Sequence, residues 1–126
     1  MRKFLLGVVV FIVLVTAFVG GVLWPPKART DAINREDADR VVNALLAYEH
    51  ANHAYPAELK DLAPKFIPQI PEVHRGSVGP HPFRYEPSDD HHAFVLRYDE
   101  APLLSMGSDA FFEYDSRTRA WRNQLY

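Results

Sequence analysis

Cysteine is absent from this chain of 126 residues. Its absence excludes disulfide bonds, thiol nucleophiles and zinc–thiolate sites, and it leaves the redox environment undetermined. Acidic residues are absent from the first part of the chain, since all 16 of them follow Trp24. Of the 14 Lys and Arg residues, all but Arg2 and Lys3 also follow Trp24. The chain beyond Trp24 is therefore net acidic and lacks the basic footprint of a nucleic-acid-binding protein.

Motifs of the common hydrolytic enzymes are missing as well. Ser105 and Ser108 lie near Asp109, but no Gly-x-Ser-x-Gly surrounds them and no histidine is placed to act as their base. The pattern assigns no catalytic residue and no cofactor, so we expect a protein that is not an enzyme.

One long stretch has no charge at all, from Phe4 to Trp24. At about 1.5 Å per residue it reaches roughly 30 Å, the thickness of the hydrocarbon core of a bilayer. We therefore expect a transmembrane signal-anchor helix over residues 1–24, with the basic tip at Arg2 and Lys3 on the cytoplasmic side. The alternative is a cleaved signal peptide with a small-residue site near Ala17, although the run is longer than usual for one. Pro25 opens a predicted linker over residues 25–30.

The next segment has helical periodicity and is predicted to form the longest helix of the domain, over residues 31–54. Thr30 or Asp31 is expected to cap it, and Glu36 and Arg40 form an i,i+4 pair. Proline at position 56 disfavours helical geometry at Tyr55 and so should end the helix. One face of this helix is apolar and needs a partner, and its members are Ala38, Val41, Val42, Leu45, Leu46 and Tyr48.

The remainder has the short alternating segments typical of β-strands. We expect one or two helical turns over residues 57–62 with Leu59 and Leu62 inward, a clip to the core at Phe66, Ile67 and Ile70, and a loop over residues 76–80. Strands are predicted over residues 83–86, 94–99, 110–115 and 120–124. The side chains expected to face the core are Phe83, Tyr85, Phe94, Leu96, Tyr98, Phe112, Tyr114 and Trp121. Together these elements predict an α+β fold over residues 31–126, in which one long amphipathic helix packs on an antiparallel sheet of about four strands.

Three side-chain groups are candidates for binding. His50 and His53 are three residues apart, so they can share a helix face, and His91 and His92 adjoin Asp89 and Asp90. These histidines give the alternative of a tethered ligand- or metal-binding domain. A calcium site from Asp109, Glu113 and Asp115 is less favoured, because Glu113 and Asp115 alternate with apolar residues as on the wet face of a strand. The third group is a small basic patch, suited to an acidic partner or to lipid head groups, and consists of Arg117, Arg119 and Arg122.

The order of these elements resembles type IV pilins and the pseudopilins of type II secretion, in particular the globular part of the major pseudopilin. The resemblance covers roughly residues 38–115. It rests on a pattern like Ala-Leu-x-x-Tyr-x-x-x-Asn-x-x-Tyr-Pro, followed by Leu-x-x-Leu and a late Ser-x-Gly-x-Asp, represented here by Ala44, Leu45, Tyr48, Asn52, Tyr55, Pro56, Leu59, Leu62, Ser105, Gly107 and Asp109.

The resemblance implies a non-enzymatic interaction domain of the bacterial cell envelope, accessory to type II secretion or to a type IV pilus. It implies a single-pass protein of the inner membrane, with a cytoplasmic N-terminus and a periplasmic domain that binds protein partners. The chain departs from the family at its N-terminus, because Gly7 lies inside the apolar run and no acidic residue occurs before Asp31. We therefore expect that the chain is not processed as a prepilin.

Overall fold

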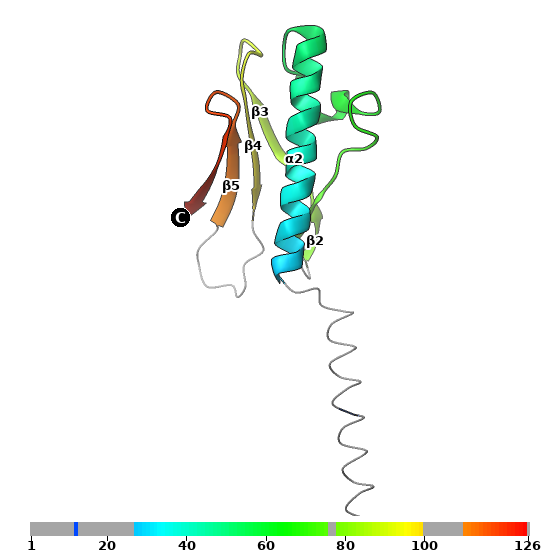
Figure 1. Cartoon of the computed structure of the whole chain (residues 1–126), viewed down its shortest axis with the longest axis vertical. Coiled ribbons are helices and arrows are strands. Elements are labelled where there is room, and N and C mark those ends of the chain that lie inside the picture. The colour runs from blue at the N-terminus through cyan, green and yellow to red at the C-terminus, as the bar shows by residue number, and fades with distance from the viewer. Residues whose placement is uncertain (1–11, 13–26, 76–77, 100–109, 126) are drawn as a thin grey trace, which may run out of the picture.

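The computed structural model describes Ile12 and residues 27–75, 78–99 and 110–125. They form an α+β domain with one long helix, one short 3₁₀ helix and two antiparallel sheets. Figure 1 shows helix α2 standing between the larger sheet on one side and the chain that follows the helix on the other. The predicted fold class is confirmed at this level.

No helix within these described residues is both long and apolar enough to cross a membrane. The predicted membrane segment over residues 1–24 lies outside the described residues apart from Ile12, so the anchor stays a prediction.

Helix α2 spans Lys27–Asn52. Its apolar stripe is buried as predicted, with Ala38, Val41 and Leu45 each at 0 % exposure. The stripe forms because apolar residues recur every three or four positions and so fall on one side of the helix. The expected surface pair between Glu36 and Arg40 is also present, with 3.6 Å between Oε1 and Nη2.

The start of α2 differs from the prediction. The helix begins at Lys27 rather than at residue 31, so the predicted linker over residues 25–30 is wrong from Lys27 onward, and neither Thr30 nor Asp31 is the cap. Thr30 is buried, which means that this early turn already packs on the domain. The preceding prolines do not oppose such a start, because the first helical turn does not need their missing N–H groups.

The end of α2 also comes earlier than expected. His53 has a φ of 61°, and its N–H donates to the carbonyl oxygen of Glu49 at 2.6 Å. A residue in this left-handed conformation ends a helix, because the chain can no longer continue the helical hydrogen-bond ladder. The predicted end at residue 54 is therefore two residues too late, and the chain leaves the helix before the Tyr-Pro stop.

A two-stranded sheet, which the sequence did not predict, lies beside the N-terminal half of α2. Strand β1 (Val73–Arg75) pairs antiparallel with β2 (Val78–His81), so residues 78–80 belong to a strand and the predicted loop is wrong there. The side-chain amide of Asn34 joins α2 to β1. Its Nδ2 donates to the carbonyl oxygen of His74 at 2.8 Å, and its Oδ1 accepts from the His74 N–H at 2.7 Å.

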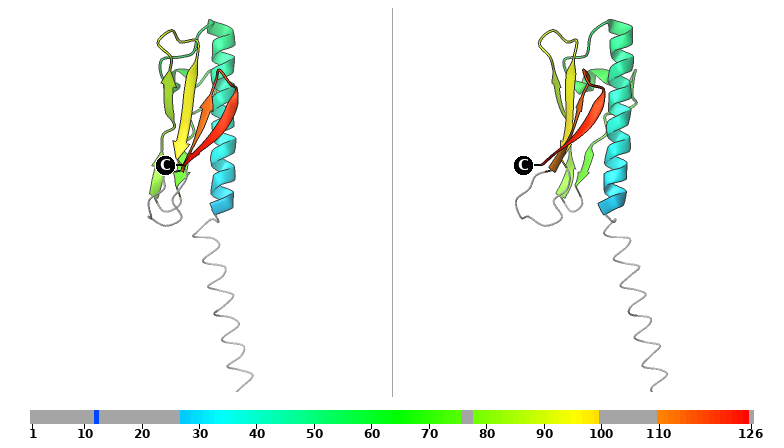
Figure 2. Two further views of the ribbon diagram at one scale, coloured as in Figure 1. Left: turned by 90° about the vertical axis from the view of Figure 1, so that its left-hand side faces the viewer. Right: turned by 60° about the vertical axis from the view of Figure 1, so that its left-hand side comes forward.

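The larger sheet has the order β3-β4-β5-β6, with every neighbouring pair antiparallel. Its strands are β3 (Arg84–Pro87), β4 (Phe94–Asp99), β5 (Ala110–Asp115) and β6 (Ala120–Leu125). These bounds lie within one residue of the four predicted strands. Figure 2 shows that the strands run roughly along α2, which covers one face of the sheet.

The core lies between α2 and this sheet. Side chains of β4 alternate between buried and half-buried positions, because successive residues of a strand point to opposite faces. Of the predicted inward residues, Phe83, Phe94, Leu96, Tyr98 and Tyr114 are buried. The other three, Tyr85, Phe112 and Trp121, are partly buried and pack against the core. On the other side of α2, the 3₁₀ helix η1 (Leu59–Leu62) buries Leu62, and Ile67 is buried as well, while Phe66 and Ile70 pack against the core.

Candidate functional site

The two histidine-bearing segments meet at the C-terminal end of α2. The turn between β3 and β4 docks on the chain that leaves the helix, since the N–H of Tyr55 donates to the carbonyl oxygen of His91 at 2.8 Å. His91 Nδ1 lies 3.2 Å from the carbonyl oxygen of Tyr55. The sequence spacing did not predict this contact, because it depends on how the hairpin folds back onto the helix.

Asp90 organises the same turn. It accepts hydrogen bonds from the Ser88 hydroxyl and from the His92 N–H, and these bonds to the charged form lower the pKa of its carboxyl below the usual value. The carboxylate is therefore already engaged with the backbone and the hydroxyl of its own turn. Its role in the structure is to hold the turn that presses His91 against Tyr55.

The histidines are not arranged as a metal site. Within residues 27–75, 78–99 and 110–125, no three His, Asp or Glu side chains converge where they would hold a metal ion. His50, His53 and His92 are exposed. The adjacency of the two segments therefore stabilises the end of the domain without assembling the ligand set that a zinc or copper site needs.

Of the three candidate calcium ligands, the structure describes Glu113 and Asp115. Asp109 lies outside the described residues, as do Ser105 and Ser108. Glu113 Oε2 accepts a hydrogen bond from Arg97, and Asp115 Oδ1 accepts one from the Arg117 N–H. Both carboxylates thus have protein partners on the solvent face of β5.

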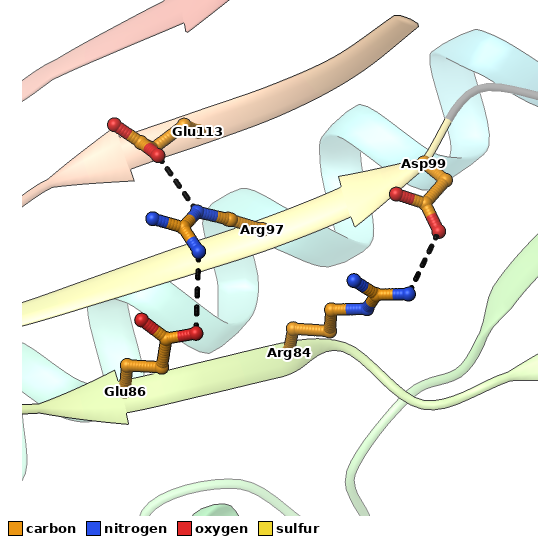
Figure 3. Close-up of polar contacts among 5 residues, drawn as sticks. All are labelled: Arg84, Glu86, Arg97, Asp99 and Glu113. Carbon is orange, nitrogen blue, oxygen red and sulfur yellow. Dashed lines mark hydrogen bonds and ion pairs between the residues drawn. The ribbon is translucent and has the colours of Figure 1, made fainter. Parts of the chain in front are cut away.

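The outer face of the sheet carries a row of ion pairs (Figure 3). Arg97 lies between two carboxylates, with its Nε donating to Glu113 Oε2 at 2.7 Å and its Nη1 donating to Glu86 Oε1 at 3.2 Å. Arg84 lies directly opposite Arg97 in the strand register, and its guanidinium turns to Asp99 at 3.8 Å. Like charges at opposing positions repel each other. The diagonal ion pairs of Arg84 with Asp99 and of Arg97 with Glu86 offset this repulsion. Arranged in this way, the row ties three strands together.

The predicted basic patch lies on the turn before β6 and on β6 itself. Arg117, Arg119 and Arg122 are all exposed, and none of the ion pairs among the described residues includes them. The turn lies toward the C-terminal end of α2 (Figure 1). Burial raises the pKa of Tyr55 and of Tyr114, and the positive charge of Arg119 acts on both in the opposite direction.

Trp121 connects β6 to the helix. Its indole Nε1 donates to Asp39 Oδ1 at 3.0 Å, and the Arg35 guanidinium lies 4.6 Å from the centre of its ring. Arg35 in turn pairs with Asp39 at 3.7 Å. Sequence reasoning placed Trp121 in the core and missed its polar contact, because nothing in a sequence separation of 82 residues indicates which helix position the indole N–H reaches.

A groove of about 1030 Å³ lies between α2 and the chain after η1. The residues that line it include the apolar Ala44, Phe66 and Ile70 and the charged Asp37 and Arg40. These two charged residues pair with each other at 3.3 Å, so they do not converge on the groove as the polar groups of a ligand site would.

Comparisons with models of known families, with curated proteins and with solved structures found no match to this chain.

Proposed function

We propose that this chain is a membrane-tethered, non-enzymatic, pilin- or pseudopilin-like interaction domain of the bacterial cell envelope, accessory to type II secretion or to a type IV pilus. The observation that carries the proposal is the order of elements along the chain. An uncharged run ends at Trp24, α2 begins at Lys27, and the helix packs on a four-stranded antiparallel sheet.

The proposed tether joins the domain at the start of α2. Residues 4–24 are the proposed contact with the lipid bilayer, and only Pro25 and Pro26 separate them from α2. With 26 residues, α2 is about 39 Å long at 1.5 Å per residue. The β3–β4 and β5–β6 turns lie toward the C-terminal end of α2, away from the residue at which the proposed tether joins the helix, which favours contact with other proteins there.

The polar clusters of the domain support a binding role rather than a catalytic one. Arg97 is held between two carboxylates, and Asp90 is held by its own turn. Catalytic groups instead converge on a place where a reacting atom could sit.

Retention of the N-terminus separates the chain from a processed pilin subunit. The prepilin pattern places a glycine before the apolar run and a glutamate a few residues later, and this chain has Gly7 within the run and no acidic residue before Asp31. An acidic side chain inside the bilayer is costly unless it is paired, and the apolar run of this chain contains no acidic residue that could form such a pair. The proposal is therefore a single-pass anchor that keeps its first residues.

Two measurements on protein from native membranes test the proposal. The chain should stay in the pellet after carbonate extraction, and its intact mass should include Met1 or Arg2. A soluble chain beginning near Phe18 would show a cleaved signal peptide and refute the tether. A mature chain beginning at Val8 would instead make the protein a processed pseudopilin.

A further inference from the structure

We propose that the free edge of β6 accepts an extended, acidic segment of a partner protein as an added antiparallel strand. This inference rests on the proposed function in one respect only, that the domain acts by binding protein. The docking surface is the outer edge of β6 together with Arg117, Arg119 and Arg122, and the partner segment is extended and acidic.

The edge of β6 is open to pairing. Among the described strands, β6 has a neighbour on one side only, and its register with β5 runs without a break from Ala120 to Leu125. Ala120, Arg122, Asn123 and Gln124 are exposed. A strand at the edge of a sheet presents unpaired N–H and C=O groups that can pair with another chain.

Of the usual protections of an edge strand, β6 carries a charge but neither a proline nor a bulge. The charge is that of the exposed Arg122, and the pairing of β6 with β5 is regular along its whole length. The opposite edge of the sheet differs, because β3 has four residues and ends at Pro87, which has no N–H to donate. Of the two edges, β6 is the one suited to an added strand.

The charges beside β6 select an acidic partner. Arg122 lies opposite Glu113 in the register, but that carboxylate receives the hydrogen bond from Arg97. Arg117 and Arg119 precede the strand and likewise have no ion pair with any described residue. A second copy of this chain would bring the same positive charges, whereas an acidic strand would supply the counter-charge.

The inner side of the added strand would lie beside Trp121. The indole is already fixed, because Asp39 accepts its N–H and Arg35 covers its ring. A fixed aromatic side chain loses little entropy on binding. The matching partner therefore alternates acidic residues, which lie beside Arg122, with apolar residues, which lie beside Trp121.

The test uses the full chain in detergent micelles and a short labelled peptide of alternating valine and glutamate, with binding followed by fluorescence anisotropy. Two further peptides carry N-methyl groups on alternate residues, one on the valines and one on the glutamates. In an extended strand each set blocks hydrogen bonding along one edge. If the peptide pairs with β6, one methylated peptide should lose binding and the other should keep it.

The variants separate backbone pairing from general charge attraction. Arg122→Glu should weaken binding about tenfold or more, since it turns attraction into repulsion. Lys65→Glu makes the same change in net charge on the exposed chain after η1 and should leave affinity unchanged. Arg122→Ala serves as the milder variant, and near-ultraviolet circular dichroism checks that each variant keeps its folded aromatic core. Hydrogen exchange should slow at amides of residues 120–125 when the unmethylated peptide binds.

Several results would overturn the proposal. These are no binding of the unmethylated peptide, equal binding of both methylated peptides, or an unchanged affinity in Arg122→Glu. Self-association of the chain that protects β6 amides without any peptide would assign the edge to a second copy instead. None of these measurements depends on the membrane anchor, so failure here is distinguishable from failure of the tether.

Discussion

Asn34 offers the sharpest test of how α2 is held against β1. Asn34 is 1 % exposed, and its side-chain amide makes two hydrogen bonds with the backbone of His74. Each such bond contributes about 1 kcal/mol net, and alanine returns about half a kcal/mol through its better helix propensity. Asn34→Ala removes both partners of the His74 backbone, in a part-buried place, and should cost about 1 to 3 kcal/mol.

The measurement is urea unfolding of the full chain in detergent, followed by the near-ultraviolet circular dichroism of the aromatic core. Asn43→Ala is the matched control, since Asn43 is exposed on the same helix and should change stability by less than about half a kcal/mol. Equal effects of the two substitutions would refute the assigned role of Asn34.

Asn34→Asp gives the same contact a dependence on pH. The carboxylate can still accept from the His74 N–H, but its second oxygen would face the His74 carbonyl oxygen without a proton to donate. Burial and this repulsion raise the pKa of the new carboxyl in the folded state above its unfolded value of about 3.9. The folded variant therefore binds more protons, and its deficit relative to wild type should shrink as pH falls through the folded pKa. A deficit that does not change with pH would contradict the geometry.

Three further predictions concern the core, the half-buried phenol of Tyr85 and the histidines. Leu45→Asp should unfold the domain, because it places an unpaired charge at a position with 0 % exposure at a cost of several kcal/mol. Ala47→Asp, on the exposed side of α2, should leave the domain folded. A folded Leu45→Asp variant would mean that the assigned buried face of α2 is wrong. Burial, and then the nearby Tyr55, raise the pKa of Tyr85 in the folded state. The free energy of unfolding that depends on the neutral phenol is therefore present below about pH 10 and should fall as the pH rises further, and the fall should be smaller in Tyr85→Phe. An equal decline in wild type and variant would refute this. Calorimetric titration of the full chain with zinc should show no stoichiometric site, and tight binding lost in a His91→Ala/His92→Ala variant would restore the metal-binding alternative.

The elements with strong periodicity could be predicted from the sequence. The buried stripe of α2 and the alternation of Phe94, Leu96 and Tyr98 follow directly from the spacing of apolar residues. Their partner is fixed in turn, because an amphipathic helix and a one-sided sheet bury their apolar faces against each other. These features need no long-range information.

The parts that escaped prediction depend on contacts distant in the sequence or on weak local patterns. Strand β2 contains Gly79 and Pro80, which are typical of loops, and it forms a strand because β1 offers it an edge. Asn34 did carry a visible pattern, since it lies four residues before Ala38 on the buried stripe, and a polar residue there needs a partner. The contact of Trp121 with Asp39 and the docking of His91 on Tyr55 left no local trace.

The most direct test of the tethered, outward-facing domain uses the absence of cysteine from the chain. Asp89→Cys places a single thiol at an exposed position of the β3–β4 turn. A cysteine inserted directly after Met1 places one in the proposed cytoplasmic tip and keeps Arg2 and Lys3, which set the orientation. Each variant is treated with a membrane-impermeant maleimide in intact spheroplasts and again after lysis, and the labelled chain is recovered from the carbonate-washed membrane. We predict that the thiol at position 89 is labelled before lysis and the thiol in the N-terminal tip only after it, both in the membrane pellet. Labelling of position 89 only after lysis, or recovery of the chain in the supernatant, would contradict it.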